Sequence, residues 1–317
     1  MEVINNVSIS QWNEIIGKCD EATFFATPEW AQVLNKTYGY KIAAKIFILG
    51  DGTKVLLPLM KTGKHQRFFS QYLSVPFHNY GGLFSERTLQ ENEIELMIKK
   101  LKGWLPIDII VVPHPFSENK PPKANKINQY STRILDLSNN FNQFWQNYHN
   151  KDQDRKVRKA RRAGVTIVTD NSTWAFEKYY GMYLDSAKRW GIKEPQPLEL
   201  YKNIHKFAER RMKLWLALKN NKIIAGIILG YFNKIVVYWG GAYYSEYGIY
   251  RPNNLLHIEA IKHARDNGYK YYDFLPSADI AGVEKFKKSF GAKKIDFYSY
   301  RITKNIKKPK FLSKLKI

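Results

Sequence analysis

The sequence is poor in cysteine and in acidic residues. Its one cysteine, Cys19, cannot build a disulfide framework or a cysteine-based zinc site, and such sparing use of cysteine fits a reducing compartment. Only 28 aspartates and glutamates stand against 51 lysines and arginines, so the formal net charge of the 317 residues is +23. The chain has no run of about 18 apolar residues and does not begin with the basic-then-apolar pattern of a signal peptide. We therefore expect a cytoplasmic protein, and we expect it to be a monomer.

The motifs of several common enzyme classes are absent as well. The sequence has no G-x-S-x-G, no H-E-x-x-H, no Walker loop and no G-x-G-x-x-G after a predicted strand. The seven histidines are scattered, and none forms a pair with metal-ligand spacing. We therefore predict no metal site, no covalent nucleophile and no bound cofactor.

What the chain has is apolar residues in abundance and an uneven distribution of charge. A hydrophobic content of 44% with 15% aromatics excludes a disordered chain, and the length favours two domains. Residues 1–150 carry 16 basic and 13 acidic side chains, whereas residues 151–317 carry 35 and 15. The second half therefore has an excess of +20, which predicts an anionic partner there.

Hydrophobic periodicity predicts the same order of elements in both halves. Each half is read as helix, helix, three antiparallel strands, helix, strand and a final strand. Asp51-Gly52 between two apolar runs predicts a hairpin, residues 115–129 are read as a loop, and Asn253-Asn254 are expected to cap a helix that ends at Gly268. The pattern alone is explained equally well by an internal duplication and by chance, because this order of elements is common.

A basic segment occupies residues 151–162, with seven basic and two acidic side chains. On a helix, Arg155, Arg158, Lys159 and Arg162 would share one face. One interpretation is a solvated surface. The other is a phosphate-binding stripe, since the acids are too few to neutralise it.

A tyrosine-rich junction follows at 238–260. Gly240-Gly241 allow close approach of a backbone or ligand, and the expected helix start at Asn253 and Asn254 offers free N–H groups to an anion. Tyr238 and Tyr243 are the candidates for contacts with a sugar or a nucleotide. The alternative is an aromatic junction with a purely structural role.

The segment 282–291 (GVEKFKKSFG) places three lysines on a short predicted helix. If one of them faced inward between Phe286 and Phe290, it would be a fixed positive charge beside the junction. Surface lysines are the alternative interpretation.

Several of these segments together resemble the FemABX-like branch of the GNAT-fold acyltransferases. The motifs, in order, are FFATPEW at 24–30, VPFHNYGG at 75–82, RKVRKARRAGV at 155–165, NNLLHIEAIKHA at 253–264, GYKYYDF at 268–274 and GVEKFKKSFG at 282–291. The resemblance implies an α/β (α+β) fold of two tandem GNAT-like domains, 1–138 and 139–317. Each would be a mixed, mostly antiparallel sheet flanked by helices, with the basic second domain catalytic.

The resemblance also implies a function. Members of this group move an acyl group to an amine, and bridge-forming members add amino acids from aminoacyl-tRNA to a peptidoglycan precursor. The lysine of the family's F-K-x-x-F-G pattern corresponds to Lys287, which would stabilise charge on the reacting carbonyl. Asn253 and Asn254 would lie near the acyl donor. Where muramyl-nucleotide-binding members carry a lysine, this sequence has Leu34, and Lys36 two residues later is the substrate-binding candidate.

The chemistry of acyl transfer leads to one further residue. The attacking amine must lose a proton, and Asp273 is the acid near these motifs that could accept it. Its alternative role is to pair with a lysine or to cap the next turn.

The acyl donor is expected to be aminoacyl-tRNA, and the alternative is acyl-CoA in surface-glycan biosynthesis. The loop that binds CoA in ordinary GNAT enzymes is glycine-rich, whereas Tyr243–Asn253 has only Gly248. The anionic partner would be tRNA, or a nucleotide- or lipid-linked glycan precursor. The tail 301–317, with seven basic residues and no acids, predicts contact with an anionic inner membrane surface or a solubilising role. A non-catalytic RNA- or membrane-binding module is the remaining hypothesis.

Overall fold

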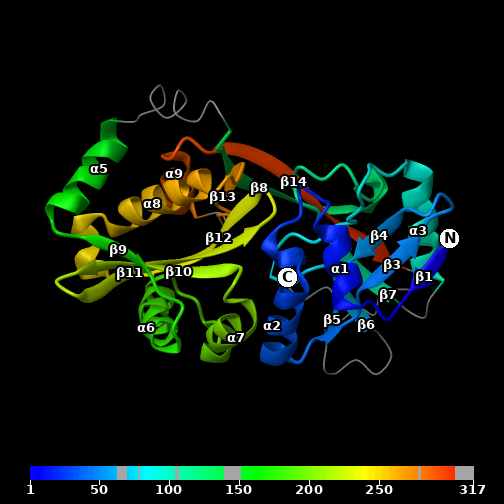
Figure 1. The fold of residues 1–317 in the computed structure, drawn as a ribbon, viewed down its shortest axis with the longest axis horizontal. Coiled ribbons are helices and arrows are strands. Elements are labelled where there is room, and N and C mark those ends of the chain that lie inside the picture. Colours follow the sequence, from blue (N-terminus) through cyan, green and yellow to red (C-terminus); the bar gives the residue numbers. More distant parts are fainter. Residues whose placement is uncertain (63–69, 78, 104–106, 139–150, 278–279, 304–317) are drawn as a thin grey trace.

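The computed structural model describes residues 1–62, 70–77, 79–103, 107–138, 151–277 and 280–303 (Figure 1). Within them the chain forms a large mixed sheet flanked by helices, together with a small three-stranded sheet. The predicted α/β class is confirmed. The basic tail beyond residue 303 and the predicted helical residues 140–150 lie outside the described part.

The described residues of the first half form three helices and strands that are short except for β8. Its elements are β1 (Glu2–Ile4), α1 (Ile9–Ile16), α2 (Pro28–Tyr38), β2 (Lys41–Ile42), β3 (Lys45–Ile48), β4 (Lys54–Leu57), β5 (Met60–Thr62), β6 (Ser70–Leu73), α3 (Glu91–Lys102), β7 (Ile107–Val111) and β8 (Lys126–Asp136). The hairpin predicted at Asp51-Gly52 is confirmed, since β3 and β4 pair antiparallel on either side of it.

The second half is built on longer strands. Its elements are α5 (Lys151–Arg162), β9 (Thr166–Thr169), α6 (Thr173–Arg189), α7 (Leu198–Ala208), β10 (Met212–Lys219), β11 (Lys222–Phe232), β12 (Ile235–Tyr243), α8 (Pro252–Asp266), β13 (Tyr271–Asp273), α9 (Ala281–Lys288) and β14 (Lys293–Thr303). Three antiparallel strands, a helix, a strand, a helix and a final strand appear in the predicted order.

One sheet runs through both halves. Its strand order is β2-β5-β6-β7-β14-β8-β13-β12-β11-β10-β9. The last strand of the chain, β14, lies between β7 and β8 and pairs antiparallel with both. In Figure 1 it crosses from the side of α9 to the side of α3. The two halves are thus joined by backbone hydrogen bonds as well as by side-chain packing.

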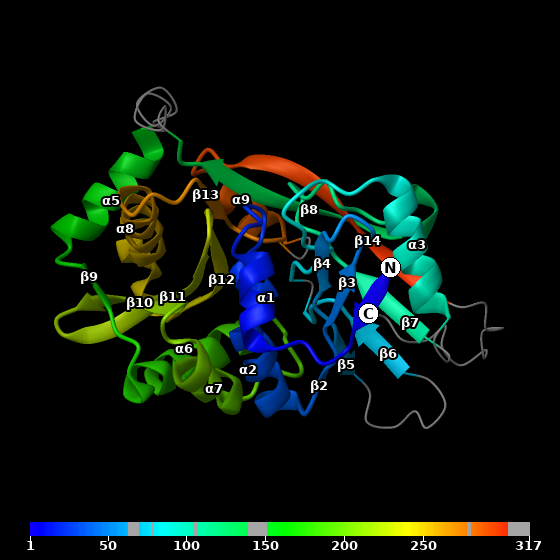
Figure 2. The same cartoon turned by 45° about the vertical axis from the view of Figure 1, so that its right-hand side comes forward.

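Helices α1 and α2 lie between α6 and α7 on one side and β3 and β4 on the other (Figures 1 and 2). The largest buried cluster therefore contains apolar residues of both halves, from Trp12 and Trp30 to Tyr179 and Met212. A second cluster lies between α5, α8 and the opposite face of β10–β12.

Two predicted boundaries are wrong. The expected loop 115–129 ends at Lys126, where β8 already begins, because residues 126–130 pair with β14. The Asn253-Asn254 pair does not cap α8. The helix begins at Pro252, and Arg251 takes the N-cap position with φ 59°, so both asparagines lie in the first turn. Proline at the first helical position explains the earlier start.

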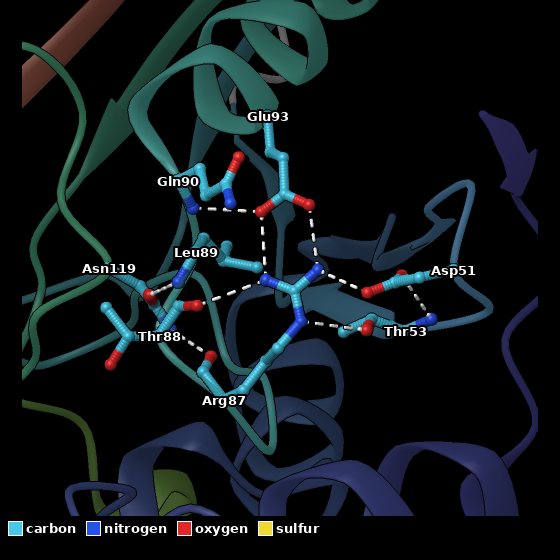
Figure 3. A network of polar contacts seen from close by, with 8 residues as sticks. All are labelled: Asp51, Thr53, Arg87, Thr88, Leu89, Gln90, Glu93 and Asn119. Atoms are coloured by element: carbon cyan, nitrogen blue, oxygen red, sulfur yellow. Dashed lines mark hydrogen bonds and ion pairs between the residues drawn. The ribbon is translucent and has the colours of Figure 1, made fainter.

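Arg87 holds the β3–β4 hairpin to the start of α3 (Figure 3). Its guanidinium donates to both carboxylate oxygens of Glu93 at 2.9 and 2.7 Å and to Asp51 at 2.7 Å. It also donates to Thr53 Oγ1 at 3.0 Å and to the carbonyl of Thr88 at 3.1 Å. All of these partners are intramolecular, so the network stabilises the fold.

This network predicts a pH dependence of stability. Hydrogen bonds from Thr53 and Arg87 lower the pKa of Asp51 to about 2, and Arg87 lowers the pKa of Glu93. Carboxylates with depressed pKa stabilise the fold above their ordinary pKa, and this contribution is lost as pH falls from about 5 to about 2. The melting temperature of R87M should lie below that of the wild type at pH 6, and the gap should close in acid. The matched control K18M, which removes the exposed pair with Glu86, should melt close to the wild type throughout. A gap for R87M that is independent of pH would contradict this account.

Candidate functional site

A cleft of about 1090 Å³ lies where the two halves meet. Its walls come from the loop after β6, from β8 and β14, from β12, and from the segment between β13 and α9. The lining residues are Phe77, Asn79, Asn128, Gln129, Tyr130, Ser131, Trp239, Leu275, Pro276, Ser277, Ala281, Glu284, Lys294 and Asp296.

The cleft opens because two neighbouring strands part. β12 and β13 pair in parallel only over Ile235–Val237 and Tyr271–Asp273. Beyond this point β12 continues to Tyr243, while the chain leaves β13 toward α9. A bulge marks the divergence, since Tyr238 and Gly240 pair with adjacent residues of β11 and Trp239 is the extra residue. The bulge places Trp239 among the residues that line the cleft.

Two residues of the lining have strained backbones. Phe77 has φ 64° and Leu275 has φ 57°, in the left-handed region that bulky side chains avoid. The other non-glycine residues with positive φ among those described are Asn220, Asn221, Asn233 and Arg251. Strain of this kind in apolar residues concentrates at functional sites, and here both instances border one cleft.

Lys287 lies directly behind the turn that contains the strained residue Leu275. Helix α9 buries its side chain to 3% exposure, while Lys285 and Lys288 face solvent. The Lys287 ammonium donates to the carbonyl of Leu275 at 2.7 Å and to that of Pro276 at 2.9 Å. Burial lowers the pKa of Lys287 to about 8, against the opposing attraction of Asp273 and Glu284. The inward lysine that the segment 282–291 could supply is therefore present.

Asp273 ends β13 and is completely buried. Its Oδ1 accepts from Thr132 Oγ1 at 2.5 Å and from the backbone N–H of Leu275 at 2.7 Å. The carboxylate is not part of the cleft lining. Its observed contacts stabilise the turn whose carbonyls, at Leu275 and Pro276, accept from Lys287. Its role as proton acceptor stays a prediction.

The two tyrosines predicted to contact a substrate, Tyr238 and Tyr243, pack against other residues of the protein instead. Tyr238 packs edge-on against His257, with ring centroids 4.5 Å apart, and burial raises its pKa. The Tyr243 ring lies under the Arg189 guanidinium at 4.8 Å, and its carbonyl accepts from Arg189 at 2.6 Å. Neither tyrosine lines the cleft.

The two asparagines have different environments. Asn254 is buried and donates to Gln153 Oε1 at 2.8 Å, which ties α8 to α5. Asn253 is half-buried, and its Oδ1 has no hydrogen-bond partner within the described residues. The unpaired Asn253 oxygen is itself buried, and the Asn254 side chain is occupied by its contact with Gln153, so the structure exposes neither of these groups to a ligand.

The predicted basic stripe on α5 is exposed. Arg155 pairs with Asp152 at 2.8 Å. Arg158, Lys159 and Arg162 are exposed and have no ion pair in the part of the chain that the structure describes. Lys36 is exposed in the last turn of α2. None of these five side chains lines the cleft, so the positive surface and the cleft are separate.

Two classes of feature are not observed in the described residues. No three side chains among His, Cys, Asp and Glu are placed to hold a metal ion. No helix there has the length and apolar character to cross a bilayer.

Sequence reasoning missed His114 and the lining residues of the first half. His114 is buried, with Nε2 at 3.5 Å from Asp273 Oδ2. Its sequence context, a histidine between two prolines after an apolar strand, is a weak signal. Phe77 and Asn79 fall in the VPFHNYGG motif, but nothing local indicates that this loop meets the second half.

Comparison with known proteins finds a domain match in the second half. Residues 149–288 match the model of the acetyltransferase (GNAT) domain. No match to a curated protein sequence was found.

Solved structures share the fold over nearly the whole chain. FemX superposes with a TM-score of 0.72 at 13% identity, covering 94% of this chain and 97% of its own. The C-terminal domain assigned to a lysylphosphatidylglycerol synthetase of Agrobacterium fabrum gives 0.60 at 11% identity, over 94% and 92%. A tandem GNAT protein from the clavulanic acid biosynthesis pathway gives 0.51 at 11%, over 97% and 99%. The predicted tandem GNAT-like architecture is confirmed.

Proposed function

This acyltransferase carries a GNAT domain within a chain of FemX-like fold, and on that basis we propose a reaction. The protein transfers an aminoacyl group from aminoacyl-tRNA to an amine of a cell-envelope precursor. Similarity to FemX and to a domain assigned to a lysylphosphatidylglycerol synthetase supports this choice of reaction. The observation that carries it is Lys287, a buried ammonium directly behind the cleft wall, which donates to the carbonyls of the lining residues Leu275 and Pro276.

Lys287 would act on the reacting carbonyl. The attacking amine forms the new C–N bond, and the ester carbonyl becomes a tetrahedral oxyanion before the C–O bond to the tRNA breaks. Two N–H groups of Lys287 donate to the carbonyls of Leu275 and Pro276, and we assign the third to the oxyanion. Because the ammonium is fixed in advance, little reorganisation is needed when charge develops.

The proton of the amine needs an acceptor. We propose that Asp273 takes it through a bridging water, since the carboxylate is buried behind the Leu275 turn and its Oδ1 is already satisfied. The proton then passes to the departing hydroxyl oxygen of the tRNA. The protein ends the cycle in its starting protonation state, with amide and free tRNA as products.

The donor would be held by the α5 stripe. Arg158, Lys159 and Arg162 are exposed cations without ion pairs in the described residues, the arrangement that binds a phosphate backbone. The cleft is lined instead by aromatic rings and amides with few charges, which suits the sugar and peptide portion of a nucleotide- or lipid-linked acceptor. Contact with an anionic membrane would bring a lipid-linked acceptor within reach.

An acyl-CoA donor is the second candidate. The acetyltransferase description of the matching domain favours it. Against it stands the single glycine between Tyr243 and Asn253, where ordinary GNAT enzymes carry a glycine-rich loop.

The two donors are distinguished by a direct assay. The protein is incubated with tRNA charged with radiolabelled amino acids, or with labelled acetyl-CoA, in the presence of a muramyl-peptide nucleotide or its lipid-linked form. Transfer from charged tRNA supports the proposal. Transfer from acetyl-CoA alone selects the second candidate, and acyl transfer from neither donor to either acceptor contradicts both.

The stripe gives a prediction of its own. The triple variant R158E/K159E/R162E should bind tRNA at least 10-fold more weakly, with a slope of log affinity against log salt smaller by about 2–3. The matched control K178E/K188E/K193E makes the same change of charge at exposed lysines on or just beyond α6, and should have a much smaller effect. Equal losses in both variants, measured by filter binding at several salt concentrations, would show that net charge alone holds the RNA.

A further inference from the structure

A cluster of polar side chains is buried behind the cleft, with members from both halves of the chain. It comprises His114 from the loop after β7, Thr132 from β8, Asp273 from the end of β13 and Tyr80 from the loop after β6. Each is at most 1% exposed. Three atoms in it lack a hydrogen-bond partner in the described part of the chain, namely His114 Nε2, Asp273 Oδ2 and the Tyr80 hydroxyl. Buried polar atoms are rarely left unsatisfied, so this group requires an explanation.

The tautomer of His114 follows from its surroundings. The backbone N–H of Phe116 donates to His114 Nδ1 at 3.2 Å, so this nitrogen carries no proton. The proton of the neutral ring is therefore on Nε2, which faces Asp273 Oδ2 at 3.5 Å. Tyr80 packs edge-on against the imidazole, at 4.7 Å between ring centroids, and fixes its plane. Both ring nitrogens are thus directed into the protein, and neither is available to substrate.

From Asp273 the connection continues to Lys287. Oδ1 accepts from Thr132 and from the backbone N–H of Leu275, which holds Leu275 in its strained conformation. The carbonyls of Leu275 and Pro276 then accept from Lys287. A buried carboxylate is costly unless all of its lone pairs are satisfied. His114 Nε2 faces Oδ2 at 3.5 Å, and the Tyr80 hydroxyl is a second donor beside the same carboxylate.

We propose that His114 is a positioning residue of the acyl-transfer site, whose Nε2–H orients the Asp273 carboxylate and, through the Leu275 turn, places the Lys287 ammonium. The first half of the chain thereby contributes His114 and Thr132 to a centre whose carboxylate and ammonium lie in the second half. The inference rests on the proposed function only for its expected effect on kcat.

The kinetic test compares H114Q with H114F. Glutamine keeps an N–H donor at nearly the position of Nε2, whereas phenylalanine keeps the ring and loses the donor. We expect H114F to lower kcat at least 10-fold with both KM values within about twofold, and H114Q to restore kcat to within about threefold. The half-exposed His205 on α7 supplies the control H205F, which should leave kcat unchanged. If H114F is active and H114Q is not, ring packing is what matters, and the proposal is overturned.

A second test needs no turnover. The pKa of Lys287 is read by NMR from its ε-carbon, assigned with K287M. The titratable groups facing it are Asp273, Glu284 of its own helix, which pairs with Arg133 of β8, and His257 of α8, whose pKa burial lowers to about 3. In H114F the pKa of Lys287 should rise if Asp273 stays ionised, or fall if Asp273 takes a proton. In H114Q it should stay at the wild-type value.

An unchanged pKa in H114F would overturn the proposal. If the wild-type protein transfers no acyl group from any donor, the proposed function fails, while the NMR titration still decides the role of His114. Melting temperatures of both variants show that the measurements are made on folded protein.

Discussion

Replacing Lys287 by methionine is expected to lower kcat about 10²- to 10³-fold, the effect of removing one preorganised oxyanion donor. Methionine is unbranched and of similar length, so it can occupy the buried space of the lysine side chain without the charge. The Leu275 and Pro276 carbonyls would lose their donor, but both border the cleft and can turn to water. Substrate binding, measured by equilibrium titration, should change little, because the lost interaction belongs to the transition state.

The neighbouring lysines provide matched controls. Lys285 and Lys288 lie on the same helix and are exposed, so K285M and K288M remove the same charge from almost the same place. Both should keep kcat within about twofold of the wild type. A loss in K288M as large as that in K287M would mean that helix charge in general, rather than the buried ammonium, supports the reaction. Unchanged turnover in K287M would refute the mechanism.

The pH profile identifies the active form of Lys287. Its pKa of about 8 means that the ammonium form predominates below this pH and is lost above it. If the ammonium stabilises the oxyanion, kcat should fall as pH rises through about 8 and be flat on the acid side of that value. If the neutral amine were required as a base, kcat would instead rise through the same pH.

The sequence predicts the elements of this fold well because they depend on local patterns. Asp51-Gly52 specifies its hairpin, and Thr27 followed by Pro28 specifies the start of α2. The error at α8 is also local, since two asparagines outweighed the preceding proline in the prediction. The insertion of β14 between β7 and β8 depends on contacts between residues more than 150 positions apart. No periodicity encodes such contacts.

The residues of the candidate site also differ in how far local sequence patterns predict them. Lys287 could be found only through the family resemblance, because the segment 282–291 has three lysines and its local pattern does not decide which of them the helix buries. The position of Asp273 could be found, but its contacts could not, since they depend on Thr132 from a distant strand. Trp239 enters the cleft through a bulge, and Phe77 through a strained loop. Both are deviations from regular structure, which reasoning from regular patterns cannot anticipate.

The junction of the two halves also depends on one buried tryptophan. Trp30 on α2 is 1% exposed and packs edge-on against Phe24 at 5.6 Å, Phe25 at 5.4 Å and the cleft residue Trp239 at 5.8 Å. W30A should lower the free energy of unfolding by about 3–5 kcal/mol, because it removes a large ring from a close-packed core and leaves a cavity. Loss of its support beneath Trp239 should also loosen the cleft wall.

The exposed Trp174 of α6 is the matched control for this prediction. It is 56% exposed and has Lys178 over its ring at 5.7 Å, so W174A should change the free energy of unfolding by no more than about 1 kcal/mol. Urea unfolding of the three proteins, followed by circular dichroism, measures both effects. At urea concentrations where W30A is still folded, its acyl transfer should also be slower than that of W174A, because Trp30 packs against the cleft residue Trp239. Equal midpoints for W30A and W174A would show that the core joining the halves can collapse around the missing ring, and that the cleft wall is held by the β12 backbone alone.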